Sequence, residues 1–168
     1  IVPIGDWVLR QACVDAAGWS RDVGVAVNLS PVQFKNPNLV SSVKAALEAS
    51  GLPARRLELE IKESVLLQNS EATLAVLHAL RGFGVRISLD DFGTGYSSPS
   101  YLRSFPFDKI KIDRSFVSEL ATRDDSMAIV RAVKVEALNS CSAYRISVPS
   151  STRPADLPAR LPSISERR

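Results

Sequence analysis

The sequence predicts an α/β fold in which parallel β-strands alternate with helices. Short strands of alternating apolar and polar residues recur about every thirty residues, and segments with helical periodicity separate them. Glycines follow the helical segments, where they typically end a helix. Because antiparallel neighbours do not need connections of helix length, we expect parallel strands, arranged in a barrel or in a doubly wound sheet.

The first elements are predicted from periodicity and from the residues at their ends. A helix is expected over residues 4–17, where apolar residues share one face and Gly18 is placed to end it. A strand at 23–30 follows. Residues 36–51 predict a second helix, with Pro37 at an early helical position.

The middle of the chain continues the same alternation. Residues 57–62 and 85–90 each alternate between apolar and polar residues, as strands with two different faces do. Between them, residues 71–82 carry a leucine stripe at helical spacing, and Ser70 can cap this helix.

The last regular elements are a strand at 108–113 and a helix from about residue 125 to 138. From residue 139 the chain is rich in serine and proline without a sustained period, which predicts an irregular or disordered tail. We therefore expect a domain over 1–138 and a tail over 139–168. An eight-stranded barrel takes about 250 residues, so about four βα units predict a partial TIM-like (β/α) barrel.

Composition limits the kinds of partner. The formal net charge is +3 at pH 7 and basic and acidic residues are intermixed, which does not indicate a DNA or RNA partner. No apolar run approaches the roughly 20 residues that cross a bilayer, so no membrane segment is expected in this chain. Cys13 and Cys141 lack the spacing of a metal site, and reduced thiols in the cytoplasm are the expectation.

The four predicted strands share one phase, with an apolar face and a polar face. In a barrel the apolar face packs on the helices, and the polar residues near the carboxyl ends gather at one mouth. Those residues are Asn28, Glu60, Asp90 and Lys111, with Asp91 immediately beyond. Oxygen ligands of this kind suit Mg²⁺, Mn²⁺ or Ca²⁺. The alternative is an antiparallel sheet whose wet face carries ordinary solvated charges.

A glycine-rich segment follows the third predicted strand. Gly93 and Gly95 permit backbone conformations that other residues rarely adopt. The backbone N–H groups and hydroxyls around them suit a phosphodiester. The hydroxyl-bearing residues are Thr94, Tyr96, Ser97 and Ser98.

Four segments resemble a known family in their order and spacing: "VNLSPVQF", "LELEIKES", "ISLDDFGTGYSSPSYL" and "FPFDKIKIDRSFV". They are similar to the EAL-type cyclic-di-GMP phosphodiesterase domains of bacteria, over residues 1–133. This resemblance implies a TIM-like (β/α)₈ barrel, a site for two Mg²⁺ or Mn²⁺ ions in which Ca²⁺ is inhibitory or non-productive, and hydrolysis of cyclic di-GMP to linear pGpG.

The resemblance also implies a role for each matching residue. Asn28, Glu60 and Asp90 would bind the first metal ion, and Asp91 would help to hold the second. Lys111 would orient or deprotonate the attacking water. Together these residues would perform two-metal hydrolysis, in which the ions generate hydroxide and stabilise phosphoryl charge.

A further set of implied roles concerns the loop after the third strand. Glu63 resembles the family's glutamate that holds this loop in its working shape. Residues 92–98, from Phe92 to Ser98, would be the loop itself, which couples metal, substrate and dimer contacts. The resemblance thus implies cyclic di-GMP as ligand, a possible homodimer through this loop, and a cytoplasmic domain whose parent protein can be membrane-anchored.

Several departures from the family pattern bear on activity. The Glu-Ala-Leu segment would precede residue 1, and the later metal-site glutamate would fall near Ser147, where the chain reads "YRISVPSS". Lys62 and Pro99 replace the usual threonine and leucine. These departures predict weak or absent hydrolysis. The alternative is a degenerate, non-catalytic domain that senses cyclic di-GMP or binds another protein.

Overall fold

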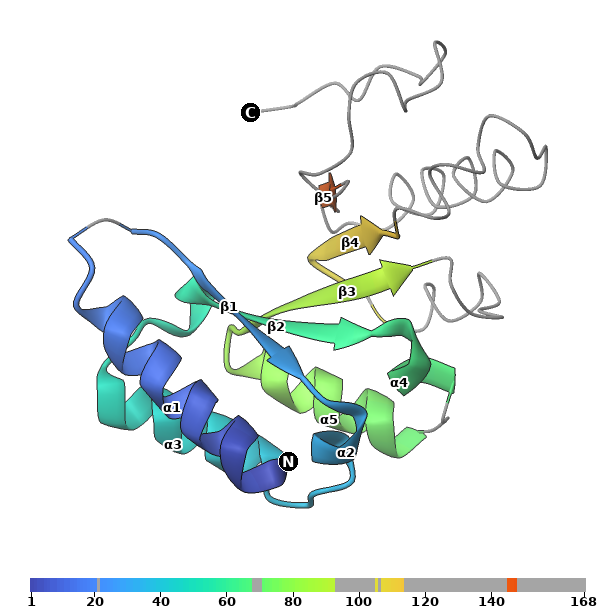
Figure 1. Cartoon of the computed structure of the whole chain (residues 1–168), viewed down its shortest axis with the longest axis horizontal. Helices are drawn as coiled ribbons and strands as arrows, with labels where there is room; N and C mark the ends of the chain where they lie inside the picture. Colours follow the sequence, from blue (N-terminus) through green and yellow to red (C-terminus); the bar gives the residue numbers. More distant parts are fainter. Residues whose placement is uncertain (21, 68–70, 93–104, 106, 114–144, 148–168) are drawn as a thin grey trace, which may run out of the picture.

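The computed structural model describes residues 1–20, 22–67, 71–92, 105, 107–113 and 145–147. Its centre is a parallel five-stranded sheet in the order β1-β2-β3-β4-β5 (Figure 1). The strands are β1 (Val25–Leu29), β2 (Leu57–Lys62), β3 (Arg86–Phe92), β4 (Lys109–Ile112) and β5 (Arg145–Ser147). The predicted α/β class with parallel strands is confirmed.

The strand order distinguishes between the two parallel architectures that the sequence leaves open. Strands that are consecutive in the chain are also neighbours in the sheet, without a reversal of order. A doubly wound sheet reverses its order at a switch point, whereas a barrel does not. The described part of the sheet therefore has the topology of a barrel wall.

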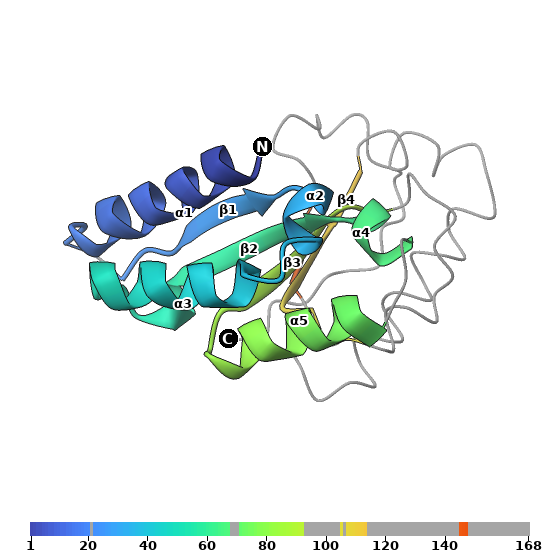
Figure 2. The same cartoon turned by 90° about the horizontal axis from the view of Figure 1, so that it is seen from below.

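Three helices cover one face of this sheet and lie side by side (Figures 1 and 2). They are α1 (Val2–Ala17), α3 (Leu39–Ser50) and α5 (Glu71–Gly82). Three shorter helices lie between them in the chain: α2 (Pro31–Phe34), the 3₁₀-helix η1 (Ala54–Arg56) and α4 (Glu63–Leu67). None of the helices in the described ranges is long and apolar enough to cross a membrane.

The hydrophobic core lies between the sheet and these helices. The apolar faces of the strands supply Leu59, Ile61, Ile87, Leu89 and Ile110, all of which are almost fully buried. The helices supply Leu9, Val43, Leu77 and Leu80. The strand phase predicted from the sequence is thus the phase that builds the core.

Several boundaries differ from the prediction. Pro37 lies before the N-cap residue Asn38 and not inside α3, because the segment 35–38 makes turns first. Helix α2 was not predicted, although Ser30 and Gln33 form the reciprocal capping box that starts it. The predicted helix at 125–138 and the capping Ser70 lie outside the described residues.

The stretch predicted as an irregular tail contains a strand. β5 pairs in parallel with β4, with Lys111 opposite Ser147 in the register. The absence of a period over 139–168 concealed it, since three residues are too few to display alternation. The division into 1–138 and 139–168 stays a prediction.

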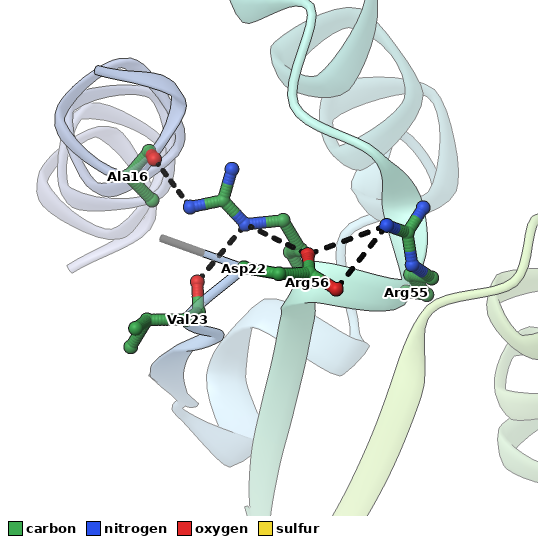
Figure 3. Close-up of polar contacts among 5 residues, drawn as sticks. All are labelled: Ala16, Asp22, Val23, Arg55 and Arg56. Carbon is green, nitrogen blue, oxygen red and sulfur yellow. Dashed lines mark hydrogen bonds and ion pairs between the residues drawn. The ribbon is translucent and has the colours of Figure 1, made fainter. Parts of the chain in front are cut away.

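Arg56 joins the first βα unit to the second at the amino-terminal ends of the strands (Figure 3). Its guanidinium donates from Nη2 to the Ala16 carbonyl at 2.7 Å and from Nε to the Val23 carbonyl at 3.0 Å. The residue is 8% exposed. Ala16 is in the last turn of α1, and its carbonyl also accepts from the Trp19 N–H at 3.1 Å, so Arg56 is a second donor to this helix end.

We expect Arg56→Ala to lower the free energy of unfolding by about 3 kcal/mol, because two charge-assisted hydrogen bonds to carbonyls are lost. The neighbouring Arg55→Ala is the matched control. Its side chain is 68% exposed, so the expected loss is at most about 0.5 kcal/mol. Urea unfolding of both variants measures the difference, and equal losses would contradict the role of Arg56.

Candidate active site

The polar face of the sheet carries the predicted site residues at the carboxyl ends of the strands. Asn28 and Glu60 are direct partners in the register of β1 and β2. Asp90 lies near the end of β3, and Lys111 lies on β4. The strand phase places these four side chains on the face opposite the helices, as predicted.

Lys111 connects the acids of two strands. Its Nζ lies 2.5 Å from Oε1 of Glu60 and 3.9 Å from Oδ1 of Asp90. Glu60 is on β2 and Lys111 is on β4, so the lysine side chain crosses β3 to reach its partner. The ammonium group compensates the charge of Glu60, which is only 7% exposed.

A second lysine–glutamate pair lies two residues earlier on the same strands, β4 and β2. Lys109 Nζ donates to Oε1 of Glu58 at 2.5 Å, and Glu58 is also 7% exposed. Ser88 of β3 lies between the two pairs and is fully buried, and its Oγ has no hydrogen-bond partner among the described residues. Its small side chain leaves room for both lysines to cross β3.

A β-bulge explains why two aspartates stand side by side at the end of β3. Leu89 pairs with Ile110 and Phe92 pairs with Ile112, so β3 has one residue more than β4 in this interval. Asp91 takes up the extra residue with a φ of 55°. Leu89 and Phe92 both lie in the core, which leaves Asp90 and Asp91 on the polar side.

Contacts with two lysines confirm that arrangement. Asp90 approaches Lys111, and Oδ2 of Asp91 lies 2.9 Å from Nζ of Lys62. The hydrogen bond with the Asp91 carboxylate and its negative charge raise the pKa of Lys62. Lys62, which departs from the resemblance, thus acts as the counter-charge of Asp91.

Two further predicted site residues lie beside this cluster. Glu63 is the first residue of α4, directly after β2, and it is buried. Its carboxylate is at a helix N-terminus, where negative charge is favourable. Phe92 was predicted as part of the loop, but it is the last residue of β3 and packs in the core, because the bulge returns it to the apolar face. Gly93, Thr94, Gly95, Tyr96, Ser97 and Ser98 lie outside the described residues.

The donor chemistry of this end of the sheet fits a divalent cation in part. Asn28 and Glu60 offer oxygen atoms from adjacent strands. The carboxylates of Glu60 and Asp90 both face the ammonium group of Lys111, so they point toward the same space. Within the described ranges, however, no three His, Cys, Asp or Glu side chains form a group that could hold a metal ion. The described residues therefore offer oxygen donors of the kind that a divalent ion binds, but they do not form a complete set of ligands.

The parallel sheet has its strands in sequential order, as in a (β/α)-barrel protein. Acids and a lysine lie at the carboxyl ends of these strands, which is where such barrels carry their sites. The sequence profile described as "EAL domain" matches residues 1–146. The chain belongs to the EAL domain family.

Two relatives illustrate this membership. The chain is 58% identical over 133 residues to the uncharacterized protein y4lL of Sinorhizobium fredii. It is 46% identical over 137 residues to MucR of Pseudomonas aeruginosa, a bifunctional diguanylate cyclase/cyclic di-GMP phosphodiesterase. Each match covers 79% of this chain but only 16% and 20% of the relative. The chain thus spans a fifth or less of the length of these curated relatives.

Solved structures show the same fold. The PaMucR phosphodiesterase in complex with c-di-GMP matches with a TM-score of 0.80 and 41% identity, over 92% of this chain and 68% of that chain. The calcium/cyclic-di-GMP complex of BlrP1 from Klebsiella pneumoniae matches with a TM-score of 0.70 and 27% identity, over 88% of this chain and 36% of that one. The predicted partial TIM-like barrel is confirmed.

The left-handed backbone conformation of Asp91 limits which residues are stable at this position. Asp and Asn tolerate this conformation, whereas a β-branched residue does not, at a cost of about 1–2 kcal/mol. We expect Asp91→Val to be less stable than Asp91→Asn by that amount in urea unfolding. Both variants lose the negative charge that pairs with Lys62, so the difference reports mainly on the backbone. Equal stability would contradict the bulge at this position.

Proposed function

We propose that this domain is a metal-dependent phosphodiesterase that hydrolyses cyclic di-GMP to linear pGpG, with weak activity in this chain because Ser147 stands near the position where the resemblance places a metal-site glutamate. The observation that carries the proposal is the cation-bridged pair of Glu60 and Asp90 at the carboxyl ends of the strands, with Asn28 beside Glu60. Membership in the EAL domain family supports the same chemistry, as does the phosphodiesterase activity in the name of MucR, which is 46% identical.

In this proposal the divalent ions, Mg²⁺ or Mn²⁺, activate a water molecule and stabilise charge on the phosphoryl oxygens when they are bound. Asn28, Glu60 and Asp90 would hold one ion and Asp91 would help to hold the other. The calcium in the BlrP1 complex supports a divalent-ion site in the family. Ca²⁺ itself would be non-productive in this domain.

The protein's own side chains then orient the reacting groups. The Lys111 ammonium, held between Glu60 and Asp90, would orient the attacking water and lie close to the developing negative charge. Lys62 holds Asp91 in place through a 2.9 Å ion pair. Glu63, buried at the start of α4, would position the loop from Gly93 to Ser98.

The loop after β3 would bind substrate and form the contact of a homodimer. The domain would act in the cytoplasm, within a parent protein that can carry a membrane anchor. The length of the relatives, of which this chain spans a fifth or less, supports a parent with further domains.

An assay of hydrolysis tests this function: the chain is incubated with cyclic di-GMP and Mn²⁺, and the amount of pGpG is measured by chromatography. We expect Glu60→Gln to lower kcat at least about 100-fold. Loss of a residue that only hydrogen-bonds a metal ligand typically lowers metal affinity or activity by about 10–100-fold, and Glu60 is itself a proposed ligand. Glu58→Gln is the matched control, because Glu58 has the same 7% exposure and the same 2.5 Å contact with a lysine of β4.

Both substitutions remove one buried ion pair and are expected to cost similar stability, but only Glu60 is a proposed metal ligand. Equal activity in the two variants would contradict the assignment of the site. Saturable binding of cyclic di-GMP by the wild-type chain without any turnover would contradict the proposed hydrolysis and leave a binding domain.

Metal binding has a readout that does not depend on turnover. At Mn²⁺ concentrations about 100-fold above Kd, a ligand that binds only the folded state adds about 2.7 kcal/mol, which corresponds to a Tm increase of roughly 5–10 °C. We expect this increase in the wild type and in Glu58→Gln, its removal by EDTA, and its absence in Glu60→Gln. A Tm that does not respond to Mn²⁺ would contradict the metal site.

A further inference from the structure

A second polar site lies at the opposite end of the sheet from the candidate active site. A pocket of about 220 Å³ is lined by Asp22, Gly24, Arg55, Arg56 and Arg86. All five lie at or just before the amino-terminal ends of β1, β2 and β3. The pocket is smaller than the roughly 300 Å³ at which pockets for drug-sized ligands begin, so it fits a small group.

The charges of this pocket do not balance. Arg55 Nη2 donates to both carboxylate oxygens of Asp22 at 3.3 Å, and Arg56 Nε lies 3.7 Å from the same carboxylate (Figure 3). Arg86 makes no hydrogen bond or ion pair with any described residue. Three guanidinium groups therefore face one carboxylate, which leaves a surplus of two positive charges.

Arg56 and Gly24 fix part of the pocket, whereas the side chains of Asp22 and Arg55 are 65% and 68% exposed. Arg56 is fixed by the carbonyls of Ala16 and Val23 and cannot turn away. Gly24 provides the space for Arg86: a Cβ at Gly24 would lie 2.7 Å from Arg86 Nη2 and 3.1 Å from the Arg56 carbonyl oxygen. Arg86 thus reaches from β3 across the end of β2 to the segment before β1.

Nearby acids do not provide the missing charge. Glu58 is the register partner of Arg86, but its carboxylate accepts from Lys109 at 2.5 Å. Asp22 is already shared between Arg55 and Arg56. The guanidinium of Arg86 therefore keeps its donors for a ligand, and the planar fork of an arginine suits a phosphate in a bidentate arrangement.

We propose that this pocket binds a phosphate group, either free or as a phosphomonoester. A phosphate carries about −1.5 to −2 charges near pH 7, which matches the surplus of two. Its oxygens can accept from several arginine donors at once, whereas a carboxylate brings only one charge. The site is separate from the metal-dependent chemistry at the other end of the strands and does not depend on it.

Isothermal titration calorimetry of the whole chain at constant ionic strength tests the proposal, with inorganic phosphate in one arm and glycerol 3-phosphate in the other. We expect saturable binding in at least one arm, and the arm that binds identifies the free or the esterified form. The absence of saturable heat in both arms would overturn the proposal.

Two variants assign the binding to the pocket. Arg86→Gln removes an exposed guanidinium that has no partner among the described residues, so it is expected to fold normally and to weaken binding at least about tenfold, or 1.4 kcal/mol. Arg55→Gln is an independent second variant with the same expected direction. Arg10→Gln, which removes an exposed arginine of α1, is the control and should bind like the wild type. Wild-type affinity in both pocket variants would overturn the proposal.

Discussion

The polar face of the sheet depends on lysines of β4 that cross β3 to reach buried glutamates of β2. Each of the two glutamates is 7% exposed and would be costly to desolvate alone. The lysines compensate this cost at 2.5 Å, and they cross on either side of Ser88, whose small side chain leaves the necessary space. The two lysine–glutamate pairs therefore stabilise the register of three strands. Lys111, which contacts Glu60, also lies close to Asp90.

The two ends of the same strands have different electrostatic character. At the carboxyl ends, Glu60, Asp90 and Asp91 face Lys62 and Lys111, so these five residues carry one excess negative charge. At the amino-terminal ends, three arginines face one aspartate. A parallel sheet makes this separation possible, because all strand ends of one kind lie at the same edge. The described residues thus give one mouth of the sheet an excess of negative charge and the other an excess of positive charge.

Much of the fold could be predicted because strand phase and helix periodicity are local signals. The alternation in "LELEIK" and "VRISLD" gives both the core residues and the polar face. The Asp91 bulge could not be predicted, since it depends on how β3 pairs with β4 and not on composition. For the same reason Phe92 was placed in the loop. The arginine pocket was missed because Arg55, Arg56 and Arg86 come together only through the sheet, and each one alone resembles a solvated charge.

The Lys111 contact is compatible with metal binding at Glu60. A carboxylate has two oxygens and about four acceptor positions, and the lysine occupies one oxygen, Oε1. The other oxygen is available for a cation shared with Asn28, its register partner on β1. The bulge adds Asp91 to the same side as Asp90, so the excess negative charge and the oxygen donors increase together at this edge. An added divalent ion would reduce that excess, which gives a physical reason for the adjacent aspartates at the end of a buried strand.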